Sequence, residues 1–118
     1  NAPDPIGPYN QAVLANDTLF LSGQIGLKPI SMKMVEGGVK EEAKQVMENL
    51  KAVLEAAEMT FDQVVKSSIF LSDMEDFSQV NEVYAAYFNN DNAPARETIA
   101  VKTLPKNVKV EISMIAVK

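Results

Sequence analysis

Residues 108–117 read VKVEISMIAV, and apolar and polar side chains alternate along this segment. A repeat of two residues is the pattern of a β-strand with one buried face and one polar face. The apolar face would carry Val108, Val110, Ile112 and Met114, and the polar face Lys109, Glu111 and Ser113. We therefore predict a strand whose apolar side needs another layer of the protein to cover it.

Two segments have the spacing of amphipathic helices that would supply this layer. Apolar residues that recur every three or four positions form one face of a helix. In residues 39–57 this face comprises Ala43, Val46, Met47, Leu50, Val53, Leu54 and Ala57. A second helix is predicted from Met74 or Asp76 to Phe88, with Phe77, Val80, Tyr84, Tyr87 and Phe88 inward.

Further strands and loops complete the predicted order of elements. Strands are predicted at residues 9–15, 18–24, 64–71 and 97–104, and Asn16-Asp17 is predicted to join the first two as a hairpin loop. Residues 1–7 predict an extended arm or turn, because they contain two Pro and one Gly. The order predicts an α+β sandwich with two helices on one face of a mixed sheet. The other face is then uncovered within the chain, so we expect it to be solvated or packed against other subunits.

Composition limits the class of protein. The chain has 118 residues, 47% of them hydrophobic and 23% charged, which fits one globular domain over residues 1–118. The net charge is −5 and there is no basic run, so we expect no nucleic-acid partner. No apolar run approaches the roughly 18 residues of a membrane-spanning helix, so we expect no membrane partner. The first residue is Asn1, so we expect that an initial segment was removed or is not represented. The cytoplasm is the expected location, or an organelle if a transit peptide was removed.

The absence of Cys, His and Trp excludes several kinds of chemistry. A chain without Cys or His has no disulfide, thiolate zinc site, cysteine nucleophile or histidine base. An all-carboxylate magnesium or calcium site stays open, although the EF-hand spacing does not occur. Any reaction must use carboxylates, Lys, Tyr, Ser, Thr, the single Arg and the backbone.

Arg96 is the first candidate for ligand binding, because the chain has ten Lys and only this Arg. A guanidinium grips a carboxylate with two parallel hydrogen bonds, which an ammonium cannot do. The alternative is a structural salt bridge with a Glu or a bond to a backbone carbonyl. Glu111 is a candidate acid–base group if its strand face is enclosed, since desolvation would raise its pKa. Its alternative is a solvated face with a Lys–Glu pair.

For the weaker candidate site residues, a purely structural role is an alternative to a role in ligand binding. Asn81 lies on the inward stripe of the second helix, where an amide could hold loop backbone or contact a substrate. Ser22 and Gly23 end a strand, and Gly23 permits a close backbone approach or a special turn. Tyr9 would serve as a core or rim aromatic more readily than as a catalytic phenol.

Several motifs in the same order resemble those of the reactive-intermediate (imine) deaminase A family, called RidA or YjgF. They are NAPDPIGPYNQAV at residues 1–13, LSGQIGL at 21–27, GGVKEEAKQ at 37–45, VVKSSIFLSDMEDFSQVNEVYAAYF at 64–88, APAR at 93–96 and LPKNVKVEISMIAV at 104–117. The likeness spans nearly the whole chain. It implies a chorismate-mutase-like two-layer sandwich with a mixed six-stranded sheet and two helices on one face. It also implies a homotrimer with sites between subunits.

The resemblance also implies an activity and a set of site residues. Family members hydrolyse 2-imino and 2-enamino acids, such as 2-aminoacrylate and 2-iminobutanoate, to 2-oxo acids and ammonia, as metabolite repair without a cofactor or metal. Arg96 matches the arginine that binds the substrate carboxylate, and Glu111 matches the acidic residue near the reacting carbon. Matches in the substrate-binding region are Tyr9, Ser22, Gly23, Asn81 and Thr98, the last at a place often held by Cys, where the backbone N–H is used. Glu97 and Ser113 depart from the common pattern; Glu97 should point away from Arg96.

Two other functions stay open. The first is a non-catalytic trimer that binds small carboxylic acids as a sensor or regulatory protein. The second is ribonuclease or translation inhibition, which some family members have been credited with. The negative charge and the lack of His argue against RNA cleavage.

Overall fold

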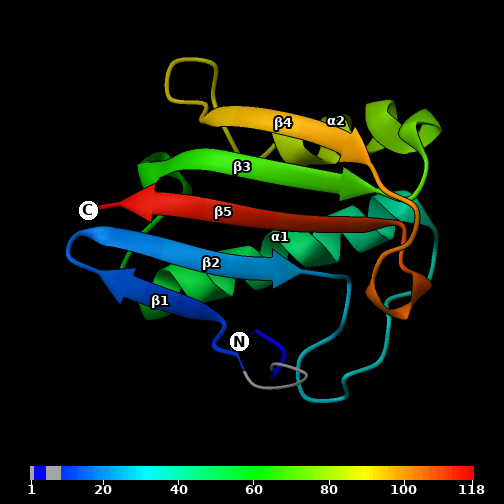
Figure 1. The fold of residues 1–118 in the computed structure, drawn as a ribbon, viewed down its shortest axis with the longest axis horizontal. Helices are drawn as coiled ribbons and strands as arrows, with labels where there is room; N and C mark the ends of the chain where they lie inside the picture. Colours follow the sequence, from blue (N-terminus) through cyan, green and yellow to red (C-terminus); the bar gives the residue numbers. More distant parts are fainter. Residues whose placement is uncertain (1, 5–8) are drawn as a thin grey trace.

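The computed structural model describes residues 2–4 and 9–118. Within these residues, five strands form one mixed sheet in the order β1-β2-β5-β3-β4, and two α-helices pack on one of its faces (Figure 1). The strands are β1 (Ala12–Ala15), β2 (Thr18–Gln24), β3 (Val64–Leu71), β4 (Ala95–Ala100) and β5 (Val110–Val117), and the helices are α1 (Val39–Ala56) and α2 (Phe77–Ala85). Strands β3 and β4 run parallel, and the other neighbours are antiparallel. The predicted α+β architecture is confirmed.

Strand β5 lies at the centre of the sheet and shows the predicted alternation. Val110, Ile112, Met114 and Ala116 are buried beneath the helices, and Glu111, Ser113 and Ile115 face the other side, partly exposed. The apolar stripe of α1 packs on these buried residues and forms most of the core. This helix follows Gly37 and Gly38, whose positive φ angles of 115° and 99° suit glycine at the turn into the helix.

The second helix is shorter than the predicted span of 74/76 to 88. Residues Met74–Asp76 form a 3₁₀ turn, in which the Asp73 side chain accepts a hydrogen bond from the Glu75 N–H at 2.9 Å. After Ala85 the α-helix ends and the backbone continues in short turns, in which the Tyr87 N–H donates to the Tyr84 carbonyl. The pattern predicted the inward face correctly, since Val80 and Tyr84 are buried. It did not predict the ends of the helix, because apolar residues have similar spacings in a 3₁₀ turn and in an α-helix.

The expected count of six strands is wrong for the part of the chain that the structure describes. The long connection between β2 and α1 contributes one isolated bridge, Leu27 to Met34, and no strand. Ile30 and Met32 have left-handed φ angles of 71° and 58°. The connection turns back on itself, with the Lys28 N–H bonded to the Lys33 carbonyl at 2.8 Å, so this segment does not lie along the sheet.

The edge strands also differ from their predicted bounds. Strand β4 was expected at 97–104 but pairs with β3 from Ala95 to Ala100, because β3 ends opposite Ala100. Strand β1 is shorter than the predicted 9–15, and the hairpin loop is confirmed, with Asn16 at a φ of 55°. Of the arm expected at 1–7, residues 1 and 5–7 lie outside the described residues.

The sheet face opposite the helices carries exposed apolar side chains. Val13 and Phe20 are opposite each other in the β1–β2 pair, and Ile99 of β4 and Val117 of β5 are also exposed. No other element of the described residues forms a layer over this face (Figure 1). The predicted uncovered face is therefore present, with apolar side chains on it.

Candidate functional site

Arg96 lies on β4 opposite Ser67 of β3, on the side of the sheet that carries the helices. Its Nη1 donates a hydrogen bond of 2.6 Å to Oδ1 of Asn81 on α2. Its guanidinium carbon is 5.0 Å from the ring centre of Tyr84 and 5.6 Å from that of Phe77. Among the described residues no carboxylate forms a salt bridge with it. An exposed guanidinium held by an amide and two rings keeps its positive charge for a ligand.

The structure shows a contact of Asn81 that its sequence position alone did not predict. Its amide oxygen accepts a bond from Arg96, so it orients the arginine. Thr98 lies two residues further along β4 and points to the same side of the sheet. Its Oγ1 is buried and has no hydrogen-bond partner within residues 2–4 and 9–118. Arg96, Asn81 and Thr98 thus form one local group, called the arginine group below.

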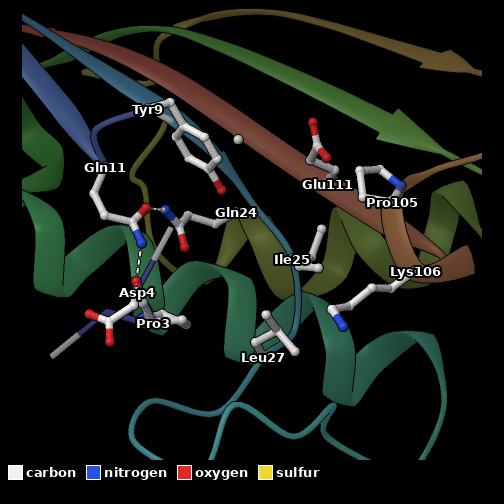
Figure 2. A pocket seen from close by; sticks show the side chains of 11 residues that line it. Pro3, Asp4, Tyr9, Gln11, Gln24, Ile25, Leu27, Pro105, Lys106 and Glu111 are labelled. Atoms are coloured by element: carbon white, nitrogen blue, oxygen red, sulfur yellow. Dashed lines mark hydrogen bonds between the residues drawn. The ribbon is translucent and has the colours of Figure 1, made fainter. Parts of the chain in front are cut away.

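A cavity of about 440 Å³ is lined by three further residues that the sequence analysis predicted for the site (Figure 2). Tyr9 comes from the segment before β1, Gly23 from β2, and Glu111 from β5. The remaining lining residues are Pro3, Asp4, Gln11, Gln24, Ile25, Leu27, Pro105 and Lys106. The volume is that of a site for a small organic molecule.

Glu111 is the acidic group of this cavity with a shifted pKa. Burial in the cavity raises the pKa of its carboxyl above the ordinary value, the shift that desolvation was predicted to cause, although the rest of this sheet face is open. The Glu111 side chain can occupy this position only because residue 23 is a glycine. A Cβ at residue 23 would lie 2.5 Å from Glu111 Oε2 and 2.8 Å from Glu111 Cδ. The glycine therefore serves a close approach between β2 and the carboxylate.

Ser22 holds backbone near the cavity. Its hydroxyl donates to the Asn10 carbonyl at 2.6 Å, and its N–H bonds the Gln11 carbonyl at 2.9 Å. These bonds attach the segment that carries Tyr9 to the end of β2. Ser22 does not itself line the cavity.

Amide side chains that sequence reasoning missed shape the cavity wall. The Gln24 amide donates to Gln11 Oε1 at 2.5 Å, and the Gln11 amide donates to the Pro3 carbonyl (Figure 2). Asn49 of α1 is fully buried and donates to the Ile25 and Leu27 carbonyls, at 3.1 and 3.0 Å. The available signal was an amide within the apolar stripe of a helix, because a buried amide must find partners.

Lys106 was also missed, and its backbone gives the reason. Lys106 and Asn107 have left-handed φ angles of 56° and 55° in the 3₁₀ turn Pro105–Asn107. This turn directs Lys106 to the cavity rim, where it lies in Figure 2. Two consecutive non-glycine residues in this conformation are uncommon, so no sequence rule predicted it.

The arginine group and Glu111 lie on opposite faces of the sheet. Arg96 is level with Ser67, which is buried below the helices, whereas Glu111 pairs with Phe70 and alternates with the buried Val110 and Ile112. Strand β3 separates them, which is two strand spacings or roughly 10 Å. One small molecule cannot contact both groups of the same chain.

The two departures from the resemblance lie on the open face. Glu97 forms a salt bridge with Lys66 at 2.9 Å and accepts a hydrogen bond from Ser68. These contacts lower the pKa of its carboxyl. The side chain points away from Arg96, as alternation predicted, and Ser113 is opposite Ser68.

Comparison with known proteins extends over the whole chain. The family model described as "Endoribonuclease L-PSP" matches residues 1–118. A 2-iminobutanoate/2-iminopropanoate deaminase of Homo sapiens is 48% identical over 117 residues, covering 99% of this chain and 85% of the human protein. A RutC family protein of Pyrococcus horikoshii is 48% identical over 118 residues, covering 100% and 93% of the two chains.

A solved structure matches the fold closely. The Rid family protein YyfA from Yersinia pestis, described as a protein of unknown function, superposes with a TM-score of 0.96 at 44% identity, covering 100% of this chain and 94% of that one. The fold and the matched sequence thus define a two-layer α+β protein of the class described as Endoribonuclease L-PSP. The chain belongs to this family, the RutC/RidA family, in agreement with the resemblance.

Two features are absent from the residues that the structure describes. No helix among them is both long and apolar enough to cross a membrane. No three acidic side chains in residues 2–4 and 9–118 come together as a metal-binding group.

Proposed function

We propose that this protein hydrolyses 2-imino and 2-enamino acids, such as 2-iminobutanoate and 2-aminoacrylate, to 2-oxo acids and ammonia. The observation that carries the proposal is Arg96, exposed and held by neutral groups without a carboxylate partner among the described residues. Such a guanidinium suits the carboxylate that these substrates share. Relatives at about half identity are named for this reaction, which supports the proposal.

Arg96 would fix the substrate carboxylate and so orient the adjacent carbon, C2, for attack. Binding of this kind lowers the barrier because the reacting groups are already aligned. Backbone groups of Arg96 and Thr98 would help to hold the amino group or the water.

Glu111 would move the proton. As the water oxygen bonds to C2, Glu111 accepts a proton from the water and the C=N electron pair passes to nitrogen. Glu111 then returns this proton to nitrogen, which gives a carbinolamine. A second proton passes from the carbinolamine hydroxyl through Glu111 to nitrogen as the C=O bond forms, and the C–N bond breaks with its electron pair on nitrogen to release ammonia and the 2-oxo acid. Its raised pKa suits a group that both accepts and returns a proton.

The proposed site combines two subunits of a homotrimer, the arginine group from one and the Glu111 cavity from its neighbour. The support is that Arg96 and Glu111 of one chain lie on opposite sheet faces. The exposed apolar side chains on the uncovered face, including Val13, Phe20 and Ile99, would be buried by such an assembly. The single domain over residues 1–118 is part of the same proposal.

A coupled assay tests the reaction. Threonine dehydratase generates 2-iminobutanoate, and semicarbazide traps the imine that this protein leaves. We expect reduced trapping with the wild-type protein and with Lys102→Ala, an exposed-cation control just after β4. Arg96→Ala is expected to lower kcat/KM by about 100-fold, because orientation is lost. Equal trapping with and without wild-type protein would refute the proposal.

A non-catalytic binder of small carboxylates is the second candidate. It needs the arginine group alone, and the separation of Arg96 from Glu111 within one chain is the observation that favours it. Binding of 2-oxobutanoate that depends on Arg96, without any imine hydrolysis, would establish this function instead.

A further inference from the structure

Tyr84 contacts Arg96 of the arginine group with its ring and Ser67 of β3 with its hydroxyl. Its side chain is buried, with 5% of the residue exposed, and its ring lies 5.0 Å from the Arg96 guanidinium carbon. At its other end the Tyr84 hydroxyl donates a 2.9 Å bond to Ser67 Oγ, which belongs to a fully buried residue. Ser67 is also the residue opposite Arg96 in the β3–β4 register. Tyr84 thus connects the core of the sheet to the exposed guanidinium.

The contacts of Arg96 restrict its orientation without neutralising it. The rings of Tyr84 and Phe77 lie near its guanidinium, and Asn81 accepts from Nη1. An arginine has five N–H donors, so one bond to an amide leaves donors for a ligand. A free arginine side chain loses rotamer entropy when it is fixed. Contacts that hold it before the ligand arrives reduce this loss on binding.

We propose that Tyr84, anchored by Ser67, is a positioning residue that fixes the guanidinium of Arg96 for two-point binding of a substrate carboxylate. The inference rests on the proposed function for the identity of the ligand, and on the contacts above for the role of the tyrosine. Burial raises the pKa of the Tyr84 phenol, so the group beneath the guanidinium stays neutral and does not compete as an anion.

The single arginine provides a direct test. The sequence contains one Arg, so the side-chain Nε–H signal of Arg96 is unique in a ¹H–¹⁵N NMR spectrum. In the wild-type protein we expect a signal displaced by the neighbouring rings and a rigid side chain by ¹⁵N relaxation. Titration with 2-oxobutanoate, a stable carboxylate, gives the dissociation constant from this signal without any turnover.

The variants separate the ring from its anchor. Tyr84→Leu removes the ring, and we expect a mobile Arg96 side chain, a signal at its ordinary position and a dissociation constant about tenfold higher. Tyr84→Phe and Ser67→Ala each remove only the anchoring bond, so smaller and non-additive increases are expected. Tyr87→Leu is the matched control: its hydroxyl bonds Glu48 at 2.8 Å, and its ring packs on Phe61.

The outcomes distinguish positioning from folding and from catalysis. Loss of stability in Tyr84→Leu and Tyr87→Leu alike, with an unchanged Arg96 signal and dissociation constant, would overturn the positioning role. If Tyr84→Leu does not fold, Tyr84→Phe and Ser67→Ala decide it: an unchanged Arg96 signal in both overturns the role. If wild-type protein hydrolyses no imine but the Tyr84 variants weaken 2-oxobutanoate binding, the positioning role stands and the proposed reaction fails.

Discussion

The acidity of a side chain in this protein depends on its surroundings as well as on its residue type. Glu111 and Glu97 are both glutamates on the open face of the sheet, yet their pKa values shift in opposite directions. Burial raises the pKa of Glu111, whereas hydrogen bonds from Ser68 and Lys66 lower that of Glu97. The two residues therefore make a matched pair for experiments on pH.

The first prediction concerns stability as a function of pH. A folded-state pKa that is raised gives stability below the unfolded pKa, and this stability is lost as pH rises through the folded value. Glu111→Gln should therefore gain stability relative to wild type as pH rises from below 4.5 to 7, whereas Glu97→Gln should lose it. Urea unfolding at several pH values measures both. A change of the same sign in the two variants would contradict the assignment.

The second prediction concerns Gly23. A Cβ at this position would overlap the end of the Glu111 side chain, which can move at little cost to the fold. Gly23→Ala should therefore reduce imine hydrolysis by about tenfold or more with a small change in melting temperature. In a Glu111→Ala background the same substitution should have no further effect on activity. An equal loss of activity in both backgrounds would contradict the proposed contact.

At the scale of elements, one helix holds the loop that forms the cavity wall. Asn49 of α1 bonds two backbone carbonyls of the connection after β2, and its own amide oxygen accepts from Gln45 at 2.9 Å. The connection has few other bonds to the body of the protein. The shape of the cavity thus depends on a residue that does not touch it.

The third prediction tests this dependence. Asn49→Ala leaves the buried Leu27 carbonyl without its side-chain donor and removes one of the two donors of the partly buried Ile25 carbonyl, the other being the Leu27 N–H. The free energy of unfolding should therefore fall by about 3 kcal/mol. Gln45→Ala removes only the bond to Asn49 and should cost less than about 1 kcal/mol. Chemical denaturation of the two variants measures the difference, and equal losses would refute it.

Element order, helix faces and the hairpin followed from the sequence because period and turn chemistry are local. The alternation in β5 and the stripe of α1 needed no information from elsewhere in the chain. The end of β4 could not be predicted locally, because the length of β4 depends on where the neighbouring strand β3 ends. The two left-handed residues of the turn before β5 were likewise beyond local rules.

At the scale of the whole molecule, the predicted site residues separate into two groups on opposite faces. Sequence reasoning identified Arg96 from its rarity and Glu111 from its strand position. It found Tyr84 only as a core residue, because its contact with Arg96 spans two elements. The sequence alone does not indicate which subunit would supply each residue to a site shared between subunits.

The fourth prediction tests a site shared between subunits. Arg96→Ala and Glu111→Gln should each have low activity alone. Co-expression of the two variants in equal amounts should recover about a quarter of wild-type activity, because about a quarter of the sites in all the trimers formed combine an intact Arg96 and an intact Glu111 from two chains. No recovery would contradict a site shared between subunits. Light scattering measures the assembly mass as a control.

The β3–α2–β4 segment has a consequence for how such proteins diversify. Ser67, Tyr84, Asn81 and Arg96 all lie within this one β–α–β unit, and the cavity residues come from the rest of the chain. The carboxylate recognition that we propose is therefore encoded in one contiguous stretch, separate from the cavity walls that would meet a substrate's side chain. In this proposal, substitutions in the cavity walls change substrate preference over evolution while the arginine group is inherited unchanged.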